Sequence, residues 1–136
     1  MNKASLRQWR EALEHGALDI YLANVYGAEA IDVWKQHYAQ ALDLFSQCYG
    51  QEGLVVIARC PGQINLMGQH IDYGGMPSVR MSVRGADTLT LARANNEGKV
   101  RVGSYLEYAG EPTDRFAPFE LDLSEIVPEE NVGTRE

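Results

Sequence analysis

The hydrophobic pattern changes from a helical to an extended period near Gly53, and this change constrains the fold more than any other feature. Before it, apolar residues recur every three or four positions, as on one face of a helix. After it, short apolar runs rich in β-branched residues are separated by turn residues. Helices first and strands afterwards predict an α+β fold, with N-terminal helices followed by a mixed or antiparallel sheet. We therefore expect a helical segment, 1–53, and a β-rich segment, 54–136.

Three helices are predicted in the helical segment. Ser5 and Gln8 have the spacing of a capping box, which marks the start of the first helix. Gly16 separates it from a second helix that ends at Gly27, and Gly50 follows the third. Their aromatic residues form a hydrophobic core or, alternatively, a set that stacks on a ligand. The predicted apolar faces carry Leu6, Trp9 and Leu13, then Leu18, Tyr21, Leu22 and Val25, then Ile31, Trp34, Tyr38, Leu42, Phe45 and Tyr49.

Several strands are predicted in the second segment. The first ends at a turn formed by Pro61 and Gly62, because these residues commonly close a strand. Asn95 to Gly98 predict a hairpin between the third and fourth strands. Pro118 confines the last strand to a sheet edge, and the polar tail 128–136 is expected to fray. The predicted strands cover residues 54–58, 79–83, 88–92, 100–105 and 115–123.

The composition of the 136 residues, 45% hydrophobic and 23% charged, suits a globular chain with one core. No apolar run approaches the roughly 18 residues of a membrane span, and the N-terminus lacks a secretory pattern. A net charge of −7 argues against nucleic-acid partners. We expect no membrane partner and a cytoplasmic location.

Two cysteines, Cys48 and Cys60, are too few for a disulfide framework and lack the paired spacing of a zinc site. Cys48 falls on the apolar face of the third helix and Cys60 ends an apolar run. Both are expected to be buried as small hydrophobic residues, and no metal site is predicted.

The chemistry of the chain concentrates in residues 61–75, PGQINLMGQHIDYGG. Glycines let the backbone turn tightly or approach a ligand closely. An alternation from Gln63 to Met67 would bury one side and expose the other. Carboxylate, amide and imidazole groups together suit a small polyhydroxylated ligand, although an ordinary glycine-rich turn explains the same composition. The polar residues concerned are Gln63, Asn65, Gln69, His70 and Asp72.

This segment resembles the galactokinase signature of the GHMP small-molecule kinases, whose usual form is P-G-R-V-N-L-I-G-E-H-T-D-Y. In this chain it is P-G-Q-I-N-L-M-G-Q-H-I-D-Y, and the likeness extends from Val55 to about Val102. The resemblance implies the start of a GHMP-kinase N-terminal domain, ribosomal S5 domain 2-like in fold. It also implies that the helical segment 1–53 and the β-rich segment 54–136 belong to one incomplete domain.

The resemblance implies a monosaccharide site. The aspartate that matches Asp72 hydrogen-bonds ring hydroxyls, and the histidine that matches His70 also lies at the sugar. Gln63 replaces an arginine associated with activating or orienting the reacting hydroxyl, and glutamine supplies no cationic field for phosphoryl transfer. Gln69 replaces a glutamate, so the preferred sugar can differ from galactose. Gln63, Gln69, His70 and Asp72 are the expected substrate-binding residues, and no catalytic residue is expected.

Three further positions depart from the family pattern. Met76, Arg80 and Arg84 replace a glycine, a proline and an acidic residue. The two arginines either face a phosphate or lie in solvent or beside acids, which is the usual place of isolated surface charges.

A GHMP kinase needs a glycine–serine loop that holds nucleotide phosphates at a helix N-terminus, a later aspartate as base, and Mg²⁺. No such loop occurs in these residues. We expect the N-terminal part of an ATP-dependent sugar kinase, inactive alone, with ATP and Mg²⁺ acting only in the complete protein and neither bound here. The alternatives are a non-catalytic sugar-sensing relative and a structural α+β module. Half a pocket leaves the polar groups of a sugar incompletely paired, so we expect no tight sugar binding by the isolated chain. Apolar surface exposed where the remaining region would dock predicts self-association.

Overall fold

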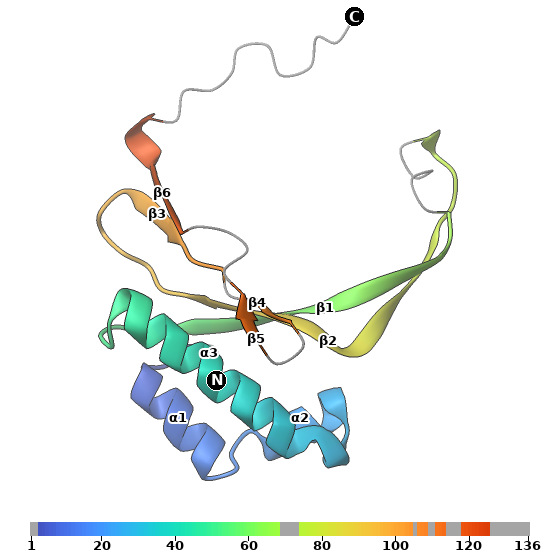
Figure 1. Cartoon of the computed structure of the whole chain (residues 1–136), viewed down its shortest axis with the longest axis horizontal. Coiled ribbons are helices and arrows are strands. Elements are labelled where there is room, and N and C mark those ends of the chain that lie inside the picture. Colours follow the sequence, from blue (N-terminus) through green and yellow to red (C-terminus); the bar gives the residue numbers. More distant parts are fainter. Residues whose placement is uncertain (1–2, 69–73, 105, 109–110, 114–117, 126–136) are drawn as a thin grey trace, which may run out of the picture. The chain divides into compact units, whose positions relative to one another are not determined.

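The computed structural model describes residues 3–68, 74–104, 106–108, 111–113 and 118–125. The chain forms two compact units, Met1–Ala94 and Asn95–Glu136 (Figure 1). Helices precede antiparallel strands, which confirms the α+β class. The ribosomal S5 domain 2-like fold and a domain division at 53/54 stay predictions. The predicted tail 128–136 lies outside the described residues.

The first unit begins with the predicted helices. The capping box is confirmed, since the Ser5 hydroxyl accepts from the Gln8 N–H at 3.2 Å and the Ser5 N–H donates to Gln8 Oε1 at 2.9 Å. Gly27 and Gly50 follow the second and third helices, both with left-handed φ. The helices are α1 (Leu6–Glu14), α2 (Asp19–Tyr26) and α3 (Ile31–Tyr49), with a 3₁₀ turn, η1 (Ala28–Ala30), before α3.

The hydrophobic core lies where these helices meet. The aromatic residues pack in this core, and the Tyr26 and Trp34 rings stack with centroids 3.7 Å apart. Tyr21, predicted on the apolar face of α2, is 45% exposed because it lies about 100° around the helix from the fully buried Leu22. Tyr26 takes the inward position. The buried large residues are Leu6, Trp9, Leu13, Leu22, Tyr26, Trp34, Tyr38, Leu42, Phe45 and Val55.

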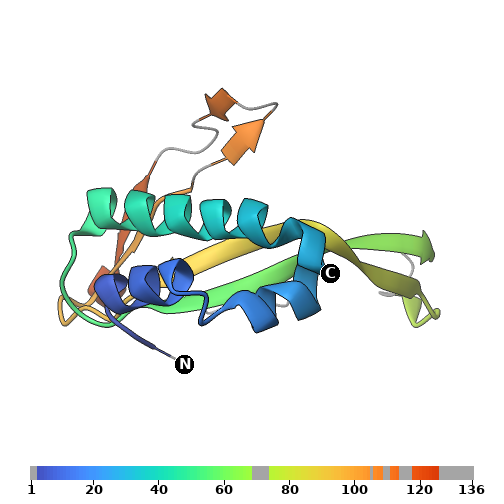
Figure 2. The same ribbon diagram turned by 90° about the horizontal axis from the view of Figure 1, so that it is seen from below.

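A long antiparallel hairpin of β1 (Val56–Met67) and β2 (Val79–Ala92) completes the first unit. Ile57, Leu89 and Leu91 pack against the helical core. Figures 1 and 2 show the helices on one face of the base of the hairpin, with α3 running along it and the far end extending beyond them.

The hairpin corrects one sequence prediction. Pro61 and Gly62 were expected to form a turn, yet β1 continues through both, while the strands predicted at 79–83 and 88–92 join into β2. Proline has no N–H to donate. In a two-stranded sheet each strand has one unpaired edge, and a residue that faces this edge needs no N–H donor. The register shifts at this point instead of the chain turning.

Both cysteines are exposed, so the predicted burial of Cys48 and Cys60 is wrong. On α3, Cys48 lies at the edge of the stripe formed by Tyr38, Leu42 and Phe45 rather than in its centre. On β1, side chains alternate between faces, and Cys60 points to the face opposite the half-buried Ile57 and Arg59.

The second unit consists of short strand pairs. β3 (Lys99–Val102) pairs with β6 (Phe119–Asp122), and β4 (Leu106–Tyr108) pairs with β5 (Glu111–Thr113). The hairpin predicted between 88–92 and 100–105 is therefore wrong, because β2 pairs with β1 and β3 with β6. A 3₁₀ turn, η3 (Leu123–Glu125), follows β6.

The turn before β3 does form. Asn95 Oδ1 accepts from the Glu97 N–H at 3.1 Å, its Nδ2 donates to the Lys99 carbonyl at 3.0 Å, and Gly98 has φ +65°. This geometry explains the turn-like sequence without joining β2 to β3. Hydrogen bonds from Arg101 and Lys99 lower the pKa of Glu120 on the neighbouring β6. Within the described part of the chain, no helix is both long and apolar enough to cross a membrane.

Candidate functional site

Residues 61–67 of the signature segment belong to β1 and lie in the far half of the hairpin. We call residues 62–67 of β1 and 79–83 of β2 the arm; it lies beyond the register shift, where Figure 2 shows the hairpin leaving the helices. The pairing gives the arm two chemically different faces. Gln63 lies opposite Ser82 and Asn65 opposite Arg80, whereas Ile64 lies opposite Met81. Cross-strand partners share a face, so the first two pairs are polar and the third apolar.

The predicted alternation is confirmed, but the predicted burial of one side is wrong. Ile64 and Met81 are each 50% exposed, because the helices cover only the base of the hairpin. On the polar face, Asn65 Oδ1 is buried without a hydrogen-bond partner. The arm thus presents both an amide-bearing face and an uncovered apolar one.

Two glycines of the signature are required by close contact between backbone segments. A Cβ atom on Gly62 would lie 2.6 Å from the Ala86 carbonyl oxygen, well inside van der Waals contact. Gly68 has φ +83°, and its Cβ would lie 2.9 Å from the Pro77 carbonyl oxygen. These glycines therefore serve close backbone approach within the protein. Around Gly74 and Gly75, a Cβ would meet nothing within 4 Å.

The structure places one of the four predicted substrate-binding residues. Gln63 is exposed on the polar face of the arm. Gln69, His70 and Asp72 lie outside the described residues, so their roles stay predictions. Ser82, opposite Gln63, carried no signal in the sequence, because its position depends on the register of the two strands.

Met76 and Arg84 are exposed. Arg84 belongs to residues 84–86, which the register shift leaves as a bulge without a Cα partner on β1. Arg80 is exposed in the arm opposite Asn65.

A charged cluster lies at the base of the arm. Arg59 Nη1 binds Asp87 Oδ2 at 2.9 Å, and the Asp87 side chain is fully buried. The Arg59 guanidinium lies over the Tyr26 ring, 5.8 Å from its centroid. Burial raises the pKa of Tyr26 well above its ordinary value, and the neighbouring Asp87 and Tyr38 raise it further. Burial also raises the pKa of Tyr38, to about 12.

The buried tyrosines predict a loss of stability at high pH. The pKa of these phenols is higher in the folded state than the value of about 10 in the unfolded chain. Below pH 10 both states are protonated and the full stability is present. As the pH rises from 10 towards the folded-state pKa, only the unfolded chain loses its proton, so the free energy of unfolding falls. For Tyr38 we expect the free energy of unfolding to fall by about 1.4 kcal/mol per pH unit between pH 10 and 12. Urea unfolding at several pH values measures it. Tyr38→Phe should remove this share of the slope, and an unchanged slope would contradict the assignment.

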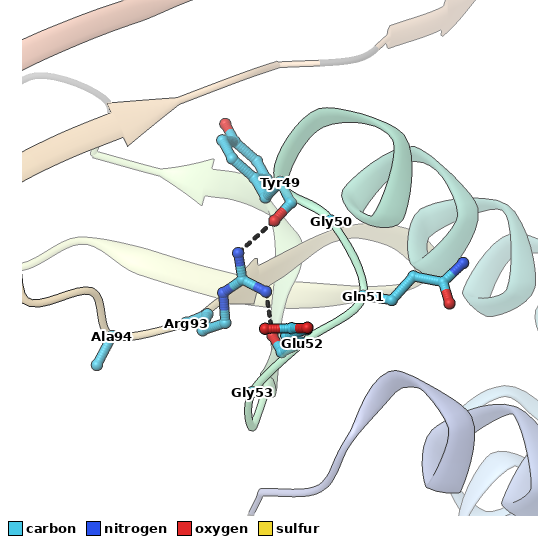
Figure 3. Close-up of a pocket in the computed structure, with 7 residues that line it drawn as sticks. All are labelled: Tyr49, Gly50, Gln51, Glu52, Gly53, Arg93 and Ala94. Carbon is cyan, nitrogen blue, oxygen red and sulfur yellow. Dashed lines mark hydrogen bonds between the residues drawn. The ribbon is translucent and has the colours of Figure 1, made fainter.

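A shallow depression lies at the other end of the hairpin (Figure 3). The Arg93 guanidinium points into it and donates hydrogen bonds to the Tyr49 and Glu52 carbonyls. Arg93 therefore caps the C-terminal end of α3, where a cation complements the helix dipole. The described residues contain no group of three acidic, histidine or cysteine side chains that could hold a metal ion.

The hairpin region matches a known protein family. Residues 43–92 match the family model described as the galactokinase galactose-binding signature. These residues comprise the end of α3, both hairpin strands and the connections between them. No solved structure matches the chain.

Two curated relatives support the same assignment. A galactokinase of Candida albicans is 29% identical over 69 residues, which cover 51% of this chain and 13% of the relative. A galactokinase of Candida parapsilosis is 30% identical over 70 residues, covering 52% of this chain and 14% of the relative. The match thus spans about half of this chain and about one seventh of either relative.

Proposed function

We propose that this chain, which is galactokinase-like over residues 43–92, supplies the sugar-binding part of a kinase that phosphorylates a monosaccharide hydroxyl with ATP. The observation that carries the proposal is the match of residues 43–92, which include the arm, to the galactose-binding signature. The polar face of the arm adds support, because Gln63 and Asn65 belong to that signature and lie together at its exposed end.

Each proposed sugar ligand has a distinct hydrogen-bonding capacity. The Asp72 carboxylate accepts hydrogen bonds from neighbouring ring hydroxyls, and His70 can donate or accept. The Gln63 and Gln69 amides do both, which suits a hydroxyl that is itself donor and acceptor. Together they orient the ring and select the sugar.

Phosphoryl transfer requires groups that these residues do not supply. ATP and Mg²⁺ would provide the phosphoryl group and its charge neutralisation. The residues here do not fit them: Gly74 and Gly75 lack the adjoining serines, and Gly103 and Ser104 lack the glycine run. We therefore propose that the isolated chain is inactive and binds neither.

Two further parts of the proposal concern the setting of the protein. We propose a cytoplasmic location, and self-association of the isolated chain through the exposed apolar residues of the hairpin. These residues have no helix over them, and exposed apolar patches favour association. They are Ile64, Leu66, Met67, Met76, Val79 and Met81, all at least 46% exposed.

A phosphorylation panel on the complete gene product tests the kinase proposal. We expect turnover of ATP with galactose or a related aldose, measured as ADP release, and none from the 136 residues alone. Absence of turnover with every aldose would contradict the kinase, and ADP release by the isolated chain would contradict its inactivity. Glycerol as acceptor controls for unspecific hydrolysis.

The second candidate function is sugar sensing without phosphorylation. It is favoured by Gln63, which replaces the family's arginine at an exposed position of the arm. Calorimetric titration of the complete gene product with galactose separates the two. Saturable binding without ADP release supports sensing, whereas binding with turnover supports the kinase.

A further inference from the structure

The ion pair between Arg59 and Asp87 is largely buried, on the face of the hairpin where Tyr26 of α2 lies. The Asp87 side chain has no exposed surface and that of Arg59 is 28% exposed. The comparable pair between α1 and α3, Arg10 with Asp43 at 2.7 Å, leaves Asp43 59% exposed. Desolvation often cancels the attraction within a buried pair, so such a pair is better explained by the arrangement it specifies.

Asp87 lies on the last regular rung before the arm, and Arg59 lies two residues earlier along β1, opposite Leu89. Asp87 is opposite Pro61, and the next pair along β1 is Gly62 with Val83, so residues 84–86 form a bulge on β2. Bulges bend a strand and increase its twist, which changes the direction of everything beyond them. Whatever fixes the register at Asp87 therefore fixes the direction of the arm.

Tyr26 connects this rung to the helices. It is the last residue of α2, and its ring is held by the stack on Trp34. Its hydroxyl and Asp87 Oδ1 are both buried without a hydrogen-bond partner. A phenol that stays protonated is a donor and a carboxylate oxygen an acceptor, so the two groups are chemically complementary. The raised pKa of Tyr26, caused first by burial and then by Asp87, agrees with this role.

We propose that Arg59, Asp87 and Tyr26 act as a brace that fixes the register of β1 against β2 at the bulge and so positions the signature strand for its ligand. The brace gives the N-terminal helices a role, because α2 supplies Tyr26 and α3 supplies the ring on which it stacks. These are positioning residues. Their effect on sugar binding rests on the proposed function, whereas their effect on register does not.

Register can be measured by disulfide trapping in the full 136-residue chain. Cys48→Ser and Cys60→Ser remove the exposed native thiols. Ile64→Cys with Met81→Cys then reports the arm, and Ala58→Cys with Thr90→Cys reports the base, since each pair consists of Cα partners. Directly opposite residues of an antiparallel pair lie within the Cα distance that a disulfide tolerates.

Asp87→Asn is the test substitution, and Asp43→Asn is its matched control, in the ion pair between α1 and α3. We expect Asp87→Asn to lower cross-linking of the arm pair at least fivefold while the base pair still forms, and Asp43→Asn to change neither. Tyr26→Phe should act in the same direction and more weakly. An unchanged arm pair, or equal loss of both pairs, would overturn the proposal. If the arm cysteines do not cross-link in the chain that retains Asp87, the register itself is refuted and the proposal is overturned.

A kinetic measurement on the complete gene product tests the link to the sugar. Asp87→Asn should raise KM for the sugar about tenfold and change kcat less than twofold. The control Asp43→Asn should change neither KM nor kcat. Unchanged KM would separate the brace from the site and overturn its positioning role. If the unsubstituted protein turns over no sugar, the proposed function fails, and the cross-linking result alone decides the brace.

Discussion

Gly62→Val should lower the free energy of unfolding by about 3 kcal/mol, although strand propensity alone predicts a gain. Valine is among the best strand formers, and replacing glycine restricts the unfolded chain, so both general effects favour the variant. The local geometry opposes them, because a Cβ at this position would lie 2.6 Å from the Ala86 carbonyl oxygen. Since that oxygen belongs to the backbone, relief requires a shift of β2 itself. Urea unfolding of the 136-residue chain measures the sign and the size.

The matched control is Gly74→Ala. A Cβ at Gly74 meets nothing within 4 Å, and its φ is outside the left-handed region. We expect a change within about 0.5 kcal/mol, as for most surface substitutions. A similar loss in both variants would mean that close approach of β2 is not the reason for glycine at position 62.

The helical half of the first unit was predictable because its determinants are local. The Ser5 capping box and the terminating Gly27 and Gly50 act within one turn of the helix that they delimit. The apolar stripe of α3 was likewise identified by its spacing, from Trp34 to Phe45. On α2, Tyr26 is buried and Tyr21 is half exposed. Which of the two faces the core depends on how the helix is rotated about its axis, and tertiary packing sets that rotation.

The hairpin was only partly predictable because its determinants are not local. Pro61 and Gly62 have the composition of a turn, and only the register shift against β2 explains how they continue a strand. The pairing of Arg59 with Asp87 depends on the same register. Asp87 falls between the predicted strands 79–83 and 88–92, and its partner could not be named before β1 and β2 were aligned.

The candidate site combines both kinds of information. The resemblance predicts that Gln63, Gln69, His70 and Asp72 bind the sugar. The family match to residues 43–92 supports the region, not the individual roles. The structure adds that Gln63 lies opposite Ser82 on a polar face. Residue roles at the sugar stay predictions that substitution must test.

Asp72→Ala should lower kcat/KM for the sugar by about 10²-fold or more in the complete gene product. Hydrogen bonds to a charged group contribute about 1.5–3 kcal/mol each, and a carboxylate that accepts from two ring hydroxyls loses both when it is removed. Steady-state kinetics with the best aldose of the panel measures the change. Asp72→Asn, which keeps the shape and one acceptor oxygen, should lose less than Asp72→Ala.

Unfolding measurements separate a ligand from a structural turn residue at this position. A sugar ligand contributes to binding and little to folding, so Asp72→Ala should unfold within about 0.5 kcal/mol of the unsubstituted chain. An aspartate that holds a turn by accepting backbone N–H bonds should instead cost about 1 kcal/mol or more on removal. Glu14→Ala, at an exposed position at the end of α1, controls for loss of one negative charge. Full activity of Asp72→Ala would refute the sugar contact, and lost activity with an equally large loss of stability would assign Asp72 to the turn.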